Sequence, residues 1–189
     1  MINYVAYRKF VTLRNGKRVM LRFLNDQDRE SLAQLFLEAP DEDTRFLKQN
    51  VKDARLINYW IDHINYSKVL PLVAVDLENN KIAADATLHR GKHASKHIGE
   101  IRIFVSRAMR NQGLGSIMLE EIISLAKQEN LMWLKAEILA DHKKVIKAFR
   151  DKGFDYKCTL DDYFIRKDGM THDVVLMMRP TVKRDDAEF

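Results

Sequence analysis

The residues best suited to chemistry form one short segment, Arg110-Asn111-Gln112-Gly113-Leu114-Gly115. Two glycines separated by one residue let backbone N–H groups approach an anion closely. A helix that starts here adds the positive end of its dipole, and Arg110 adds a full positive charge. The segment therefore predicts a phosphate-binding loop, and a tight strand-to-helix turn without a ligand is the alternative. A P-loop is excluded because no Gly-Lys-Ser/Thr follows.

The flanking sequence predicts the elements that position this loop. Ile101, Ile103 and Val105 alternate with Arg102 and Phe104, which is the period of a strand with its aliphatic residues on one face. After the loop, apolar residues recur on one side of a helix at Leu114, Ile117, Met118, Ile122, Leu125 and Ala126. We therefore expect a strand over residues 100–105, then the loop, then an amphipathic helix.

The sequence from Val105 to Gly115 resembles the V-x-x-x-x-R/Q-x-x-G-x-G/A signature of the GNAT superfamily of N-acyltransferases. In that family the loop grips the pyrophosphate of coenzyme A, so the resemblance implies acetyl-CoA as the cofactor. It also implies that the backbone N–H of Val105 donates to the thioester oxygen. The resemblance and the loop together predict cofactor contacts at Phe104, Val105, Arg110, Asn111, Gln112, Gly113, Leu114, Gly115, Ser116, His142 and Phe149.

A second segment, residues 141–154, resembles the family's E-N-x-x-A-x-x-L-Y-x-K-x-G-F pattern with two departures. His142 stands where asparagine is usual, beside the expected pantetheine arm, and a plain helix-start histidine is the alternative. Phe149 stands where many members have a tyrosine that protonates the leaving thiolate. The sequence therefore predicts no acid at this position, and Tyr156 and Tyr163 are the remaining phenols that lie nearby in the sequence.

Glu100 is the candidate general base, because it lies on the strand that leads to the loop and alternates with the aliphatic residues. A carboxylate there takes the proton of the attacking ammonium directly or through water. The alternative is an ordinary strand glutamate paired with Arg102. The Pat-type protein lysine acetyltransferases, which this chain resembles at residues 16–23, 25–28, 44–47 and at Gly99-Glu100, have a glutamate at this position.

The resemblance thus implies an N-acetyltransferase with a primary amine as acceptor, in particular a protein lysine side chain. A small amine, such as a polyamine or an amino sugar, is the alternative acceptor. The alternative from a different functional class is an acyl-CoA-binding regulatory domain without catalysis. Phe149, in place of a tyrosine, supports this alternative, and the candidate base Glu100 counts against it. A nucleic-acid-binding module is not expected, because the basic residues are spread along the chain.

The order of predicted elements indicates an α/β (α+β) fold of the GNAT type, with a mixed sheet and helices on both faces. An N-terminal hairpin over residues 9–13 and 18–24 turns at Asn15-Gly16, and a helix capped by Asn25 or Asp26 follows. The remaining predicted elements, in chain order, are a helix over 54–64, strands over 71–76, 81–88 and 100–105, the loop helix, a strand over 132–139, a helix over 143–152, and strands over 154–159 and 174–178. We expect one domain over residues 1–180 and a polar, disordered tail over 181–189.

The composition is that of a globular domain: 189 residues, 46% hydrophobic, one cysteine and a formal charge of +5. No signal peptide or membrane-spanning stretch is visible, so we expect a cytoplasmic protein. The expected oligomeric state is a monomer or a homodimer. His89, His93 and His97 recur every four residues, but they lie in a lysine-rich loop that repels a cation. No metal site is therefore expected.

Overall fold

The protein is described by a computed structural model that covers residues 2–166 and 168–182. Its residues group into two compact units. Of the described residues, one unit contains Ile2–Thr87 and Ile103–Met118, and the other contains Leu88–Arg102 and the residues from Leu119 to Val182. The single domain over 1–180 stays a prediction, and most of the expected tail, residues 183–189, lies outside the described residues.

Within the described residues the chain forms eight strands and five α-helices, which confirms the mixed α/β fold. The strands are β1 Lys9–Thr12, β2 Arg18–Phe23, β3 Val69–Asp76, β4 Lys81–Arg90, β5 Ile98–Val105, β6 Trp133–Leu139, β7 Asp155–Ile165 and β8 Thr171–Pro180. The helices are α1 Arg29–Leu37, α2 Asp41–Thr44, α3 Ala54–Asp62, α4 Leu114–Gln128 and α5 Lys143–Asp151. The strand order is β1-β2-β3-β4-β5-β6-β8-β7, with β5 and β6 parallel and β6, β8 and β7 antiparallel.

The N-terminal hairpin is confirmed, with Thr12 opposite Arg18 in an antiparallel pair of strands. Its predicted two-residue turn is wrong, because the Leu13 N–H donates to the Lys17 carbonyl at 2.8 Å and encloses three residues. Gly16 is the third of them, with a φ of 85°. A left-handed glycine after a tight turn is typical of three-residue hairpin loops.

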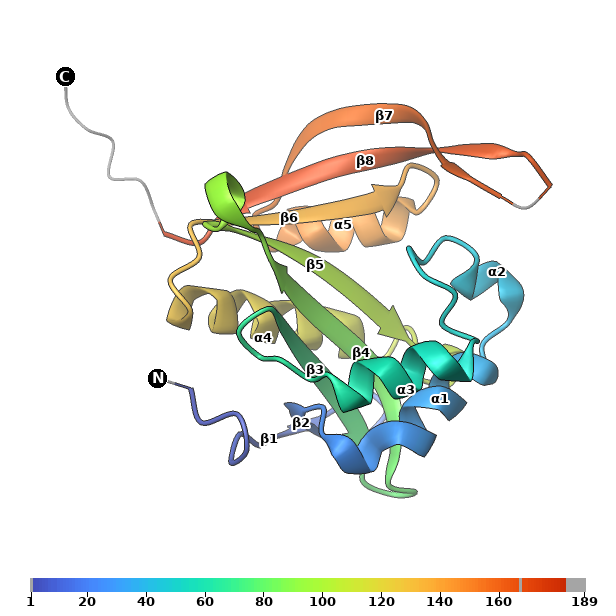
Figure 1. Cartoon of the computed structure of the whole chain (residues 1–189), viewed down its shortest axis with the longest axis vertical. Helices are drawn as coiled ribbons and strands as arrows, with labels where there is room; N and C mark the ends of the chain where they lie inside the picture. Colours follow the sequence, from blue (N-terminus) through green and yellow to red (C-terminus); the bar gives the residue numbers. More distant parts are fainter. Residues whose placement is uncertain (1, 167, 183–189) are drawn as a thin grey trace. The chain divides into compact units, whose positions relative to one another are not determined.

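The core of the first-described unit forms where α1 and α3 pack side by side on β3 and β5 (Figure 1). The apolar face of α1 is buried, with Leu32 and Phe36 at most 2% exposed. Burying a side chain of this size stabilises the folded state by about 1.5–3 kcal/mol. α3 ends at Asp62 rather than residue 64, because His63 leaves the helical conformation, with a φ of −122° and a ψ of 31°.

The other unit contains the hairpin of β7 and β8, both longer than the sequence predicts. β7 runs to Ile165 and β8 starts at Thr171, whereas the predicted strands covered 154–159 and 174–178. The added residues are largely exposed, and in β7 two adjacent aspartates are followed by three adjacent hydrophobic residues, Tyr163, Phe164 and Ile165, so no apolar alternation is present to recognise. Such residues are tolerated because β7 is the edge strand of the sheet.

No helix of the described chain is long and apolar enough to span a membrane.

Candidate active site

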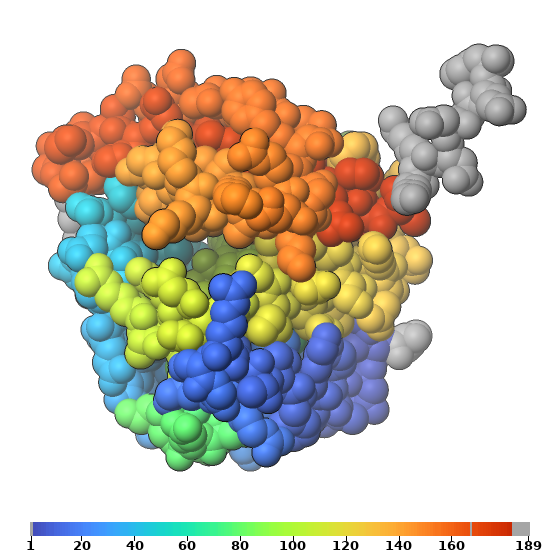
Figure 2. Space-filling view, turned by 180° about the vertical axis from the view of Figure 1, so that it is seen from behind, coloured from blue at the N-terminus to red at the C-terminus, as the bar shows by residue number. Residues whose placement is uncertain are grey.

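The predicted phosphate-binding loop connects β5 to α4 and is shaped by two residues with positive φ. Asn111 has a φ of 61° and Gly113 a φ of 90°, a conformation that asparagine and glycine adopt most readily. The Arg14 N–H donates to the Gln112 carbonyl at 3.2 Å and ties the loop to the N-terminal hairpin. Figure 2 shows the hairpin (blue) against this part of the chain (yellow-green).

The first turn of α4 follows directly, and the Ile117 N–H closes it on the Gly113 carbonyl at 3.1 Å. The N–H groups of Leu114, Gly115 and Ser116 therefore belong to the helix start, where no intrahelical acceptor exists. A Cβ built on Gly115 meets only the Val105 side chain, at an ordinary 3.7 Å. The loop has the geometry of an anion cradle, with glycine required by conformation at 113 and not at 115.

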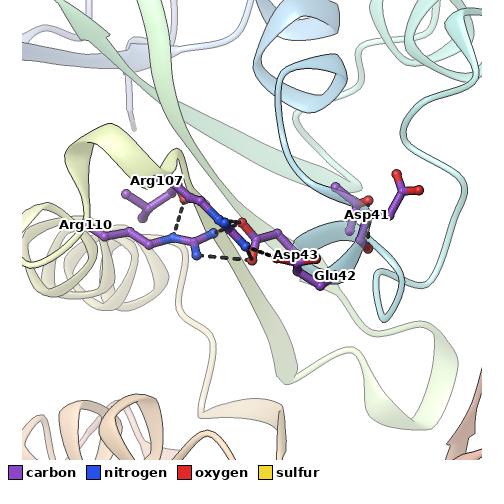
Figure 3. A network of polar contacts seen from close by, with 7 residues as sticks. Asp41, Glu42, Asp43, Arg107 and Arg110 are labelled. Atoms are coloured by element: carbon purple, nitrogen blue, oxygen red, sulfur yellow. Dashed lines mark hydrogen bonds and ion pairs between the residues drawn. The ribbon is translucent and has the colours of Figure 1, made fainter.

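Arg110 does not stand alone beside the loop. Its two terminal nitrogens donate to the carboxylate of Asp43 at 3.2 and 2.9 Å, and its Nε donates to the Val105 carbonyl at 3.0 Å (Figure 3). Arg107 reaches the same carboxylate at 2.7 Å and also contacts Glu42. Arg110 is thus paired with an acidic residue of α2, Asp43, and the sequence did not indicate this pairing.

Hydrogen bonds from Arg107, and then from Arg110, hold the pKa of Asp43 below its usual value against the opposing effect of burial. The side chain of Asp43 is 12% exposed, so these contacts are weakly screened. A carboxylate held ionised by two arginines fixes the position of Arg110 at the end of β5.

The alternation predicted for β5 is correct at its start and wrong at its end. Ile101 is 3% exposed, but Ile103 and Val105 are only partly buried, and Phe104 is buried instead at 7% exposed. The ring of Phe104 packs on Phe36 with centroids 5.2 Å apart. The core contact of this large side chain overrides the predicted burial pattern, and the cofactor contact at Phe104 stays a prediction.

Glu100 is held by two cations. Its carboxylate accepts a hydrogen bond from Arg102 at 2.8 Å and lies 3.1 Å from the Lys135 ammonium on β6. Lys135 also contacts Glu137 at 2.9 Å. Burial lowers the pKa of Lys135, but the hydrogen bonds with Glu137 and Glu100 outweigh it, so the pKa lies above its usual value. The pairing with Arg102, left open by the sequence, is therefore present.

The two predicted residues of α5 differ in exposure. His142 occupies the N-cap position of the helix without a side-chain capping hydrogen bond, its side chain is 55% exposed, and its Nε2 lies 3.8 Å from Asp141. Phe149 is 7% exposed and packs edge-on against Phe154 with centroids 5.0 Å apart. His142 is thus available to a ligand, whereas the Phe149 ring is mainly a core side chain.

Introducing a phenol at this position tests whether catalysis needs an acid there. We expect Phe149→Tyr to change kcat by less than about threefold, because a thiolate with a pKa of about 8.5 leaves without prior protonation. The measurement is the pH profile of kcat/KM in both forms, with a plateau at high pH. A descending limb that disappears in Tyr156→Phe or Tyr163→Phe would contradict this and identify the acid.

One acidic residue near the loop was missed by the sequence analysis. Asp85 lies on β4, and burial raises its pKa to about 7. The signal in the sequence was a single charged residue inside the apolar run Ile82-Ala83-Ala84-Asp85-Ala86. A carboxyl group with a pKa raised by burial is a candidate for proton transfer.

Comparisons with known proteins agree with these observations. Residues 30–154, more than half of the chain, match the model of the acetyltransferase (GNAT) family. A segment of 86 residues, 44% of this chain, is 30% identical to the candidate phosphinothricin acetyltransferase YwnH of Bacillus subtilis (strain 168). The matched segment spans about half of that relative, 53% of its length.

Solved structures show the same fold. The GNAT domain of S. lividans PAT superposes with a TM-score of 0.74 at 24% identity, covering 92% of this chain and 96% of that one. The GNAT superfamily phosphinothricin acetyltransferase (Pat) from Sinorhizobium meliloti, in complex with AcCoA, gives a TM-score of 0.75 at 18% identity over 95% and 96% of the two chains. At these identities the likeness is one of fold.

Proposed function

Because the chain belongs to the GNAT family of acetyltransferases, we propose that it transfers an acetyl group from acetyl-CoA to a primary amine. The observation that carries this proposal is the loop from Val105 into α4, in which Gly113 has a φ of 90° and three helix-start N–H groups follow. Backbone N–H groups at a helix start bind phosphate oxygens.

In this proposal residues 110–116 bind the pyrophosphate, and the Phe104 and Val105 backbone borders the acyl group. The Val105 N–H polarises the thioester carbonyl, and His142 and Phe149 border the pantetheine arm. Bound acetyl-CoA supplies an activated acyl group with a thiolate as leaving group. Arg110 adds its positive charge beside the pyrophosphate while its guanidinium stays hydrogen-bonded to Asp43 at 3.2 and 2.9 Å.

Glu100 is the proposed general base. Its ion pairs with Arg102 and Lys135 orient the carboxylate. A carboxylate oriented in this way accepts the proton that leaves the nitrogen after attack on the thioester, because the new bond to an electron-poor carbon makes that proton acidic.

The finer proposal is a protein lysine side chain as acceptor. The support is the resemblance of the N-terminal elements to the Pat-type protein lysine acetyltransferases. A small amine is the second candidate, favoured by a relative whose name denotes a phosphinothricin acetyltransferase.

Mass spectrometry separates these acceptors. A proteome and a metabolite extract are each incubated with the protein and isotopically labelled acetyl-CoA. We expect labelled lysine side chains in proteins, at sites absent from a reaction with the Glu100→Gln variant. A label found only in small amines would assign the second candidate instead.

A further inference from the structure

Asp85 occupies an unusual place on β4. Its neighbours Ala84 and Ala86, which point to the opposite face of the strand, are both 0% exposed. Asp85 and Thr87, which share the other face, are only partly buried. The Asp85 side chain is therefore largely surrounded by protein and still reached by solvent.

No described residue donates a hydrogen bond to Asp85 or forms an ion pair with it, and burial is the one cause of its raised pKa. The charged residues of the neighbouring strands have other contacts. Asp76 of β3 lies 3.5 Å from Lys17, and Glu100 and Arg102 of β5 pair with each other. A carboxyl group this poorly solvated is costly unless a partner binds it.

Asp85 lies close to the start of the phosphate-binding loop, in the same compact unit. The Ser106 N–H donates to the Ala83 carbonyl at 2.9 Å, so β4 and β5 are hydrogen-bonded beside Val105 and two residues before Asp85. Hydrogen-bonded strands lie about 4.8 Å apart. Asp85 is thus near the backbone that borders the acyl group in the proposed function.

We propose that Asp85 binds the acceptor amine in its ammonium form and accepts a proton from it before attack. This inference rests on the proposed function and deepens it by assigning the residue that recognises the acceptor. An ammonium supplies the partner that the carboxyl group lacks, and ion pairing in a poorly solvated site is strong.

The proton balance then uses both carboxylates. Conversion of an ammonium to an amide removes two protons from the nitrogen. Asp85 takes the first, and the freed lone pair forms the C–N bond to the thioester carbonyl carbon. The C–S bond breaks with its electron pair on sulfur, Glu100 takes the second proton, and the thiolate is protonated by water.

The inference also predicts the class of acceptor. A cationic amine with no anionic group beside the nitrogen fits an unpaired carboxyl group, as in a lysine side chain or a polyamine. The carboxylate of an α-amino acid is repelled by Asp85. We therefore expect kcat/KM for a polyamine or an Nα-acetyl-lysine amide to exceed that for phosphinothricin by at least about tenfold.

Substitution of Asp85 by asparagine tests the assignment through its pH dependence. At pH 7.5 we expect kcat/KM for the amine to fall by about 10²-fold or more, because the variant must capture the rare neutral amine. Toward pH 10 the neutral amine becomes abundant, since its pKa is about 10.4, and the deficit should shrink below about fivefold. Asp85→Glu should recover part of the activity at pH 7.5.

Two further measurements separate this role from a structural one. Folding raises the pKa of the Asp85 carboxyl group to about 7, so its ionisation lowers the free energy of unfolding as the pH rises toward 7 and above. Asparagine does not ionise, and the thermal midpoint of Asp85→Asn at pH 8 should therefore equal or exceed that of the wild type. The increase of the midpoint by acetyl-CoA should be unchanged. A deficit that is the same at every pH, or no deficit at pH 7.5, would overturn the inference, whereas a wild type inactive with every amine would overturn the proposed function.

Discussion

Substitution of Glu100 by glutamine is expected to lower kcat by about 10²- to 10⁴-fold near neutral pH. Glutamine keeps the size of the side chain but cannot accept the proton that leaves the nitrogen. The measurement is kcat at saturating acetyl-CoA and amine, together with the dissociation constant of acetyl-CoA. That constant should stay nearly unchanged, because Glu100 has no proposed role in cofactor binding.

Glu137→Gln is the matched control for this substitution. Glu137 contacts the same ammonium, that of Lys135, at 2.9 Å, so its loss disturbs the same ion-pair network. We expect this control to keep kcat within about threefold of the wild type. Equal losses in the two variants would mean that the network, and not proton transfer at Glu100, determines the rate. A Glu100→Gln variant with wild-type turnover would reject the base.

Substitution of Gly113 by valine is expected to remove most of the rise in thermal midpoint that acetyl-CoA causes. A ligand that binds only the folded state stabilises it by about 2.7 kcal/mol at a hundred times its dissociation constant. Gly113 has a φ of 90°, where a branched side chain is strained, and the added side chain would narrow the loop that is proposed to bind the pyrophosphate. Thermal denaturation with and without acetyl-CoA gives the difference directly.

Two other glycines provide controls. Gly169 has a φ of 83° with no atom within 4 Å of a built Cβ, so Gly169→Val reproduces the backbone strain away from the loop. Gly115→Ala places a methyl group inside the loop without strain, since its Cβ would lie 3.7 Å from Val105. Both controls should keep the acetyl-CoA shift. An undiminished shift in Gly113→Val would locate the anion site elsewhere.

The loop was predictable from the sequence because its requirements are local. The positive φ values of Asn111 and Gly113 follow from residue types that tolerate this conformation, and α4 follows from apolar periodicity. The order of the strands and helices along the chain was predictable for the same reason, since turn residues and alternation mark most of the strand ends.

The contacts of the charged residues were not predictable, because they depend on partners distant in the sequence. Asp43 lies 67 residues before Arg110, and Lys135 reaches Glu100 through a parallel strand pair. Phe104 departs from the burial pattern predicted for β5 because its ring packs on Phe36, and no local sequence pattern encodes this contact. Asp85 was visible as a single charge in an apolar strand, but its lack of a partner emerges only when the fold is known.

The central claim, acetyl transfer to an amine, is tested most directly by the release of free coenzyme A. The purified protein is mixed with acetyl-CoA and a panel of amines, and the new thiol and the N-acetyl product are quantified together. The account predicts amine-dependent thiol release, equal in amount to the N-acetyl product and lost in Glu100→Gln. Acetyl-CoA binding at the loop with no amine-dependent thiol release for proteins or small amines would contradict it and indicate an acyl-CoA-binding regulatory domain.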